Sequence, residues 1–269
     1  MKIIFSKLSR FWRIFATGLA FAFFGLGGLI FSLFYFPLIG LLFKSDRKKK
    51  QIVRSSVSLG FKVFMYFMHY IGVLYFHKNK IELLKNEKSC ILIANHPTLI
   101  DVIAIIAYCP NACCIVKKEI WRNFFLKGVV KIAGYVPNIE HTDLLKKCEQ
   151  SVKNGDVLII FPEGTRTKPG QPPVFQRGAA HIALNLNCPV RCVEIQCHPL
   201  TLTKGLPWYQ VPERRTDFTI EVKDRIDPQE CITEGSSRSL AARKMTRLFF
   251  NQCCGSEYEM KRKVYGERF

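Results

Sequence analysis

Apolar residues are concentrated at the start of the chain. From Ile14 to Phe43 no residue is charged, and Arg13 and Lys44 flank the run. As one helix it would be about 45 Å long, which exceeds the roughly 30 Å hydrocarbon core of a bilayer. The run is too long for a signal peptide, and an entirely apolar helix of this length is not expected in the core of a domain this small. It therefore predicts a helical segment that inserts into a membrane.

The sequence permits two modes of membrane insertion. Three glycines lie near the middle of the run, and Pro37 follows in its second half. These residues permit either a break that gives two short helices dipping into one leaflet, or a tilted and kinked span. Basic residues at both ends suit a hairpin in one leaflet at least as well as a span. The basic cluster at 44–50 favours the cytoplasmic side for the residues that follow.

A second apolar stretch, residues 57–76, contains Lys62 and His69 among many aromatic residues. We expect a helix that lies in the membrane interface or packs against the first segment. An ordinary amphipathic helix that covers the folded domain is an equal alternative. We therefore divide the chain into a membrane-associating helical region, residues 1–76, and a folded domain, residues 77–269.

In the folded domain, short apolar runs alternate with segments of helical spacing. The pattern predicts strands at 89–94, 111–116, 157–161 and 190–196, an edge strand at 218–222, and helices at 101–108, 142–153, 178–186 and 236–250. The uniformly apolar strands are typical of a sheet that is covered on both faces. The alternation predicts an α/β fold with a mostly parallel sheet flanked by helices, preceded by the hydrophobic N-terminal membrane-associating segment.

The amino-acid composition limits the classes of molecule that this protein is expected to bind. The formal net charge is +19, from 40 Lys+Arg against 21 Asp+Glu, and 48% of the residues are hydrophobic, which excludes a disordered chain. The densest basic run lies beside the N-terminal apolar segment, and most phenylalanines lie in the apolar segments instead of alternating with basic residues. Anionic membrane lipids are therefore the expected polyanionic partner, and nucleic acid is not. The 11 cysteines form no CxxC pair, which favours a reducing compartment and no metal site.

Two strand ends carry unusual polar strings. In the first, His96 follows a buried strand directly and Asp101 lies five residues further on. If the chain turns at Pro97, Asp101 can hold one imidazole nitrogen and leave the other free as a general base. The alternative is that His96 satisfies a turn and Asp101 caps the following helix, and spacing alone favours that alternative.

The second string follows the strand at 157–161. It offers the carboxylate of Glu163, then Gly164, the hydroxyl of Thr165 and the guanidinium of Arg166. A glycine lets backbone N–H groups approach a ligand closely, and an arginine suits a phosphate or carboxylate. The alternative is a surface turn with a Glu163–Arg166 ion pair of little energetic value.

Together the two strings, H-x4-D and later F-P-E-G-T-R, resemble the glycerolipid acyltransferase family, whose type members are 1-acylglycerol-3-phosphate acyltransferases. The likeness covers about residues 89–196. Phe175–Ala179 looks like the family's segment after its third block, and Val116–Glu119 like its lysine-containing stretch. A hydrophobic N-terminal helical motif that seats the enzyme on the membrane is typical of the family as well, so the resemblance names residues 77–269 as an acyltransferase domain.

The resemblance implies a mechanism. His96 would deprotonate a lipid hydroxyl, with Asp101 orienting it, and the hydroxyl would attack the thioester of an acyl-CoA or acyl-carrier protein directly. No acyl-enzyme is needed, in agreement with the lack of a G-x-S-x-G string. The string from Glu163 through Gly164 and Thr165 to Arg166 would bind the acceptor's headgroup. The resemblance implies no metal and no cofactor beyond the thioester co-substrate.

One departure from the family pattern affects the acceptor. The family's second block ends in an arginine, whereas no arginine lies between Arg122 and Arg166 here. Lys117 or Lys131 could replace that cation in binding substrate. A lysophospholipid-like acceptor is expected, and an aminolipid or a polyene glycolipid is the alternative. A non-catalytic, membrane-anchored lipid-binding protein is the second alternative, although the chain keeps both His96 and Asp101.

Overall fold

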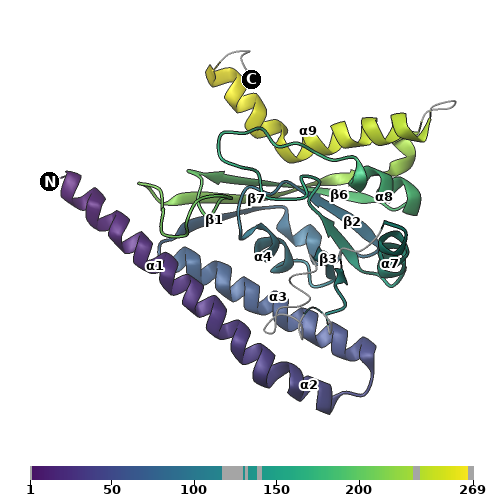
Figure 1. The fold of residues 1–269 in the computed structure, drawn as a ribbon, viewed down its shortest axis with the longest axis horizontal. Helices are drawn as coiled ribbons and strands as arrows, with labels where there is room; N and C mark the ends of the chain where they lie inside the picture. The colour runs from purple at the N-terminus through teal and green to yellow at the C-terminus, as the bar shows by residue number, and fades with distance from the viewer. Residues whose placement is uncertain (1, 117–129, 131–132, 138–140, 233–236, 266–269) are drawn as a thin grey trace.

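The computed structural model describes residues 2–116, 130, 133–137, 141–232 and 237–265. Within these residues a seven-stranded sheet is flanked by helices on both faces (Figure 1). The strands are β1 Leu74–Asn79, β2 Cys90–Ala94, β3 Ala112–Val116, β4 Val136–Pro137, β5 Val157–Ile160, β6 Val190–His198 and β7 Thr216–Ile226. The helices are α1 Lys2–Ile30, α2 Phe36–Leu42, α3 Asp46–Tyr70, α4 Asp101–Ile106, α7 His141–Lys153, α8 Gly178–Leu186 and α9 Arg238–Tyr265.

The strand order is β1-β7-β6-β2-β5-β3-β4. Every described neighbouring pair is parallel except β6–β7, which is antiparallel. In the centre, Ile93 of β2 lies opposite Ile160 of β5 and Cys192 of β6. The predicted mostly parallel α/β fold is therefore confirmed. Because β6, β2 and β5 run in the same direction, the loops that follow them meet at one edge of the sheet.

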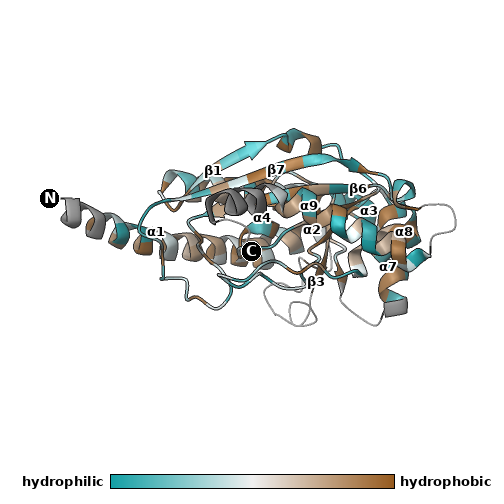
Figure 2. Cartoon of the chain, turned by 90° about the horizontal axis from the view of Figure 1, so that it is seen from above, coloured by the Kyte–Doolittle hydropathy of each residue, from teal (hydrophilic) through white to brown (hydrophobic). Residues whose placement is uncertain are grey.

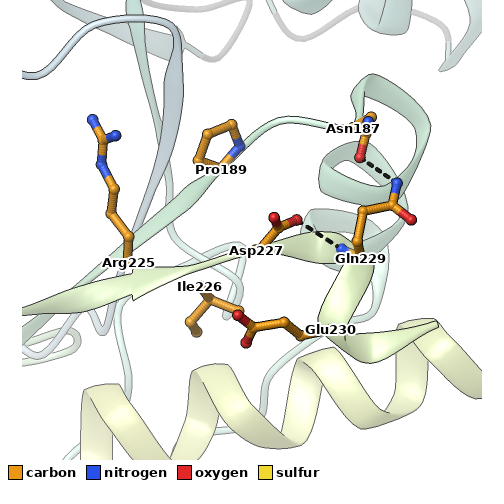
Figure 3. Close-up of a pocket in the computed structure, with 7 residues that line it drawn as sticks. All are labelled: Asn187, Pro189, Arg225, Ile226, Asp227, Gln229 and Glu230. Carbon is orange, nitrogen blue, oxygen red and sulfur yellow. Dashed lines mark hydrogen bonds between the residues drawn. The ribbon is translucent and has the colours of Figure 1, made fainter. Parts of the chain in front are cut away.

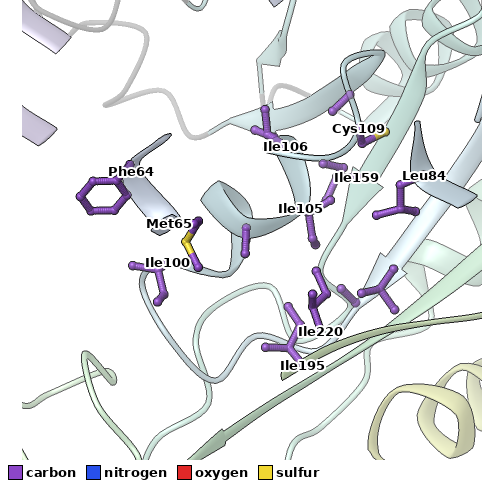
Figure 4. Close-up of a cluster of buried hydrophobic side chains, with 14 of the residues drawn as sticks. Phe64, Met65, Leu84, Ile100, Ile105, Ile106, Cys109, Ile159, Ile195 and Ile220 are labelled. Atoms are coloured by element: carbon purple, nitrogen blue, oxygen red, sulfur yellow. The ribbon is translucent and has the colours of Figure 1, made fainter. Parts of the chain in front are cut away.

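Alternate residues of β2 enter two different cores. Leu92 and Ala94 pack into a core shared with α1, α2, α3 and α4, part of which Figure 4 shows. Ile91 and Ile93 pack into a second core with α7, α8 and α9. Successive side chains of a strand point to opposite faces, so a strand buried on both faces must be apolar at every position. This explains the uninterrupted apolar run from which β2 was predicted.

The N-terminal apolar run forms one arm of a helical hairpin. It stays helical through its three central glycines, passes through a π-helical segment at Phe31–Tyr35, and ends at Leu42. The chain then reverses, and α3 returns beside α1, where Phe23 and Phe67 stack with ring centroids 4.5 Å apart (Figure 1). Neither the predicted break nor a kink occurs at the glycines, because the hairpin turn lies after α2 and α3 supplies the second arm.

The outer face of this hairpin is apolar and exposed. Figure 2 shows α1 as a long helix with many apolar residues, drawn in brown. Phe11 is 71% exposed and Leu41 is 84% exposed. Residues Leu8–Leu42 are long and apolar enough to cross a membrane, and only 17% of their most apolar window is buried. The hairpin thus covers one face of the domain and leaves a wide apolar surface on its other side.

Four sequence-based boundaries differ from the structure. The second apolar helix was expected to begin at residue 57, but α3 begins at Asp46. The helix predicted at 57–76 ends at Tyr70, and β1 follows, so the expected division at residue 76 falls within a strand. The predicted edge strand at 218–222 is wrong in position, because β7 lies between β1 and β6. Helix α9 continues to Tyr265, beyond the predicted end at 250.

Candidate active site

The two polar strings lie side by side at the carboxyl edge of the sheet. His96 follows β2 and Glu163 follows the adjacent strand β5. The backbone N–H of His96 donates to Glu163 Oε1 at 2.8 Å, and the backbone N–H of Thr167 donates to the carbonyl oxygen of His96 at 3.0 Å. Parallel pairing of β2 with β5 therefore brings together residues that are far apart in the sequence.

His96 and Asp101 form the hydrogen-bonded pair that was one of the two interpretations of their spacing. His96 Nδ1 lies 2.8 Å from Asp101 Oδ2, and the Asp101 side chain is fully buried while that of His96 is 17% exposed. Asp101 also accepts a hydrogen bond from the backbone N–H of Thr98 at 2.7 Å and one from the Thr98 hydroxyl. The expected turn and the expected pair therefore exist together. Asp101 is the first residue of α4, whose cap residue is Ile100.

This environment sets the orientation of the imidazole. An ionised Asp101 accepts a hydrogen bond from the protonated Nδ1 of His96. The free lone pair of the imidazole then lies on Nε2. Phe161 stacks on the ring at a centroid distance of 4.2 Å. No described residue hydrogen-bonds Nε2. Burial raises the pKa of Asp101, and hydrogen bonds from His96 and Thr98 oppose that rise.

Glu163 is a partly buried carboxyl without a cationic partner in the described part of the chain. Burial raises its pKa to about 7, and the hydrogen bond from the His96 backbone partly opposes the rise. Its second oxygen accepts a hydrogen bond from the Thr167 hydroxyl. The alternative of a Glu163–Arg166 ion pair is not realised, because Arg166 donates to the carbonyl oxygen of Leu202 at 3.2 Å. Glu163 therefore joins the two strings, and Arg166 retains its charge for another partner.

Gly164 makes the turn that follows Pro162. Its φ is +67°, a conformation that side chains with a Cβ rarely adopt, and its N–H donates to the carbonyl oxygen of Phe161 at 3.0 Å. Thr165, next in the chain, is exposed, and its hydroxyl oxygen accepts a hydrogen bond from Lys204 Nζ at 2.9 Å. Gly164, Thr165 and Arg166 thus form an accessible surface beside the His96–Asp101 pair.

Sequence reasoning did not identify two contributors to this edge. The side chain of Asn95 exchanges two hydrogen bonds with the backbone of Ile195, at 2.8 and 2.7 Å, and so joins β2 to β6 just before His96. The loop after β6 supplies Leu202, whose carbonyl oxygen also accepts from the Leu99 N–H at 3.0 Å, and Lys204. A polar residue directly after an apolar strand was a signal for Asn95, but its partner depended on the strand order.

Other predicted site features fall elsewhere. Lys117 and Lys131 lie outside the described residues. Within the described residues, no three His, Cys, Asp or Glu side chains gather as metal ligands would, and the 11 cysteines are buried and form no disulfide. These results give no site for a metal or a disulfide among the residues that the structure describes.

A cavity of about 490 Å³ lies at the opposite edge of the sheet from His96 (Figure 3). Its polar groups bond one another: Asp227 accepts from the Gln229 N–H at 2.9 Å, and the Gln229 amide donates to Asn187 at 2.6 Å. Arg225, also on its wall, pairs with Glu87. These groups are already partnered, so the cavity is not the candidate active site.

A family model matches the part of the chain that holds this site. Residues 75–196, which include both polar strings, match the family model described as Acyltransferase. The glycerolipid acyltransferase resemblance is thereby confirmed, and the matched segment begins within β1.

Individual relatives agree with this assignment. The chain is 30% identical over 140 residues to 1-acyl-sn-glycerol-3-phosphate acyltransferase BAT2, chloroplastic, of Brassica napus, covering 46% of this chain and 41% of that protein. It is 37% identical over 101 residues to the 1-acyl-sn-glycerol-3-phosphate acyltransferase of Helicobacter pylori, covering 35% and 42%. The matches span about two fifths of the length of these two relatives.

A solved structure extends the likeness to the whole fold. The chain resembles the crystal structure of the 1-acyl-sn-glycerophosphate (LPA) acyltransferase, PlsC, from Thermotoga maritima with a TM-score of 0.63 at 19% identity. The similarity covers 93% of this chain and 96% of that one. It therefore includes the N-terminal hairpin as well as the sheet.

Proposed function

We propose that the protein is a membrane-bound acyltransferase that moves a fatty acyl group from a thioester to the hydroxyl of a lysophospholipid-like acceptor of the 1-acylglycerol-3-phosphate type. One observation carries the proposal: the His96–Asp101 pair, 2.8 Å apart, at the carboxyl edge of an acyltransferase-family sheet. The names of the relatives support the acceptor class. The thioester donor is an acyl-CoA or an acyl-carrier protein.

In the proposed reaction, His96 Nε2 accepts the proton of the acceptor hydroxyl while that oxygen attacks the thioester carbonyl carbon. Asp101 stabilises the imidazolium that forms and fixes its orientation. The tetrahedral intermediate then collapses, the carbon–sulfur bond breaks, and the thiolate takes the proton from Nε2. The products are the ester and a free thiol, and no bond to the protein forms at any step.

The surface formed by Gly164, Thr165 and Arg166 is proposed to bind the acceptor's headgroup. The planar guanidinium of Arg166 suits a phosphate oxygen pair. Glu163 supports that surface through its hydrogen bonds to the His96 backbone and the Thr167 hydroxyl. Lys117, on a segment outside the described residues, stays a predicted contributor of positive charge.

The hairpin is proposed to lie in one leaflet of a membrane, with the domain on the cytoplasmic face. Its inner side is fixed to the domain: Trp12 Nε1 donates to the carbonyl oxygen of Ile71 at 2.9 Å, and Arg13 donates to that of Pro212. A helix with one face on the domain and an apolar face exposed suits the boundary of a leaflet. Cysteines that form no disulfide and the basic residues before and within α3 support the cytoplasmic orientation.

A panel of donors and acceptors tests the proposed function. The full chain in detergent micelles is incubated with labelled acyl-CoA or acyl-carrier protein and with 1-acylglycerol-3-phosphate, other lysophospholipids, an aminolipid, a polyene glycolipid or monoacylglycerol. We expect the fastest ester formation with a phosphate-bearing lysolipid. If transfer is fastest to a lipid without a phosphate, the proposed acceptor class is wrong and that lipid class takes its place. No transfer with any pair would favour a non-catalytic lipid-binding protein.

A further inference from the structure

The loop between β6 and β7, residues 199–215, connects the candidate active site to the N-terminal hairpin. It leaves the carboxyl end of β6, which neighbours β2 in the sheet. Figure 1 shows this region, in green, beside α1 at the end of the sheet where β1 and β7 lie. The sequence analysis assigned no role to this loop, which we call the β6–β7 loop.

One end of the β6–β7 loop is fixed to α1. Buried Arg13 donates to the carbonyl oxygens of Pro212, at 3.2 and 3.1 Å, and of Glu213. The Trp208 ring lies 6.0 Å from that of Phe21, and a Cβ added at Gly18 would lie 3.3 Å from it. Because α1 is the proposed membrane helix, these contacts hold the loop beside the segment that is proposed to meet the lipid.

The other part of the loop is fixed to the polar strings. The carbonyl oxygen of Leu202 accepts hydrogen bonds from the Leu99 N–H at 3.0 Å and from Arg166 at 3.2 Å. Two residues later, Lys204 Nζ donates to the Thr165 hydroxyl oxygen at 2.9 Å. Lys204 is therefore held against the turn that carries Arg166, and Arg166 is held against the loop that carries Lys204.

Neither cation is neutralised by a carboxylate of the described residues. The buried Arg54 and Arg191, by contrast, are paired with Asp156 and Glu87. Two positive side chains held together without a counter-charge repel each other, and an anion between them would remove that repulsion. A phosphate monoester has enough oxygen atoms to accept hydrogen bonds from both and from the Thr165 hydroxyl.

We propose that Lys204 is a phosphate-binding residue that works with Arg166 to hold the headgroup of the acceptor. The inference rests on the proposed function, since it names a residue that would bind the phosphate of that acceptor. The β6–β7 loop, through its contacts with α1, presents Lys204 to a headgroup whose acyl chain stays in the leaflet. The recognised chemistry is the phosphate monoester, and not the length of the acyl chain.

Equilibrium binding tests the inference without relying on turnover. The full chain in detergent micelles is titrated with 1-acylglycerol-3-phosphate, monoacylglycerol and free CoA. For Lys204→Ala we expect the Kd for 1-acylglycerol-3-phosphate to rise about 10-fold, because one charge-assisted hydrogen bond to the phosphate is lost. The Kd for monoacylglycerol and for CoA should stay unchanged, and Lys204→Arg should restore most of the affinity. Lys153→Ala, which removes the same charge from exposed α7, is the matched control.

The outcomes separate this inference from the proposed function. Equal weakening for 1-acylglycerol-3-phosphate and monoacylglycerol would show that Lys204 only supports the loop, and weakening for CoA alone would assign it to the donor. Either result, an equal loss in Lys153→Ala, or no change in Lys204→Ala, overturns the inference even if the parent transfers acyl groups. A selective loss for the phosphate acceptor sustains it, even if the parent transfers none and the proposed function fails.

Discussion

The two edges of the central sheet both bury carboxylates, but they treat them in opposite ways. At the amino edge, Asp156 before β5 contacts Arg54 at 2.6 Å and Lys50 at 2.7 Å, both on α3. Burial acts to raise the pKa of Asp156, but the two cations outweigh it and the pKa is lowered. Glu87, before β2, is paired with Arg191 and Arg225, and its pKa is lowered for the same reason.

At the carboxyl edge, Asp101 is buried and Glu163 is partly buried, and neither has a lysine or arginine partner among the described residues. Burial raises the pKa of both, and only hydrogen bonds and His96 oppose it. Buried charges that are fully paired hold elements together, whereas unpaired ones persist where chemistry uses them. The amino edge joins the hairpin to the domain through paired charges. The carboxyl edge keeps groups that can exchange a proton or bind a ligand.

The largest expected effect is on catalysis at the carboxyl edge. His96→Ala and Asp101→Asn should each lower kcat by about 10² to 10⁴-fold, the range for loss of a positioned acid–base group. Initial rates of acyl transfer measure this, with circular dichroism to confirm that the variants are folded. Parent-like rates in folded His96→Ala would refute the assignment of the base.

The next effect is on stability at the amino edge. Arg54→Met leaves Asp156 with Lys50 as its one cationic partner among the described residues and with the hydrogen bond from the Ser151 hydroxyl. It should lower the free energy of unfolding by about 3 to 5 kcal/mol, as expected when one partner of a buried pair is removed. Denaturant titration in micelles measures it, and kcat per folded molecule should stay unchanged.

Lys49→Met serves as the matched control for that variant. Lys49 lies on the same helix and faces exposed Asp46 at 3.5 Å, so its removal should change stability little. If Arg54→Met lowers kcat while leaving stability intact, the two edges do not have the separate roles that the comparison gives them.

A third effect is the opposite pH dependence of the two edges. The pKa of Glu163 is raised from 4.5 to about 7, so its contribution to stability is fully present below about pH 4.5 and is lost as the pH rises through 7. The carboxyls with a lowered pKa, Asp156 and Glu87, contribute above their unfolded pKa and lose that contribution as the pH falls.

Glu163→Gln isolates the Glu163 contribution. The free energy of unfolding of the parent minus that of the variant should fall by about 1.4 kcal/mol for each pH unit between the two pKa values. Thermal unfolding from pH 4.5 to 8 measures it. Glu230→Gln, at an exposed position, should give a difference independent of pH. If the difference in free energy of unfolding between the parent and Glu163→Gln does not change with pH, burial does not disfavour ionisation of the Glu163 carboxyl.

The smallest effect is expected within the amino edge itself. Arg225 and Arg191 both contact Glu87, but the Arg225 side chain is 49% exposed and that of Arg191 is 10% exposed. Arg225→Gln should therefore cost less than about 1 kcal/mol, because solvent screens an exposed pair. Arg191→Gln should cost more in the same denaturant titration. Equal costs would mean that exposure does not set the strength of these pairs.

The sequence by itself determined the features that depend on neighbouring residues. The uniformly apolar run of β2 predicted a strand buried on both faces, and the alternation of elements predicted the parallel sheet. The five-residue spacing of His96 and Asp101 permitted their contact, because a single turn joins them, but spacing alone favoured a turn and a helix cap over the pair. The apolar N-terminal run predicted its own helix for the same reason, because helix formation depends on neighbouring residues. The apolar character of its exposed face follows directly from the residues of the run.

The tertiary structure decided the features that join distant residues. Glu163 contacts the His96 backbone instead of Arg166 because β5 pairs with β2. The first residues of β1 lie in an apolar run that also suited a helix, and only their pairing with β7 shows that they form a strand. The contact of Lys204 with Thr165 depends on β6 lying beside β2. Such contacts follow from strand order, which is fixed by the packing of the whole sheet, and local patterns along the chain do not encode it.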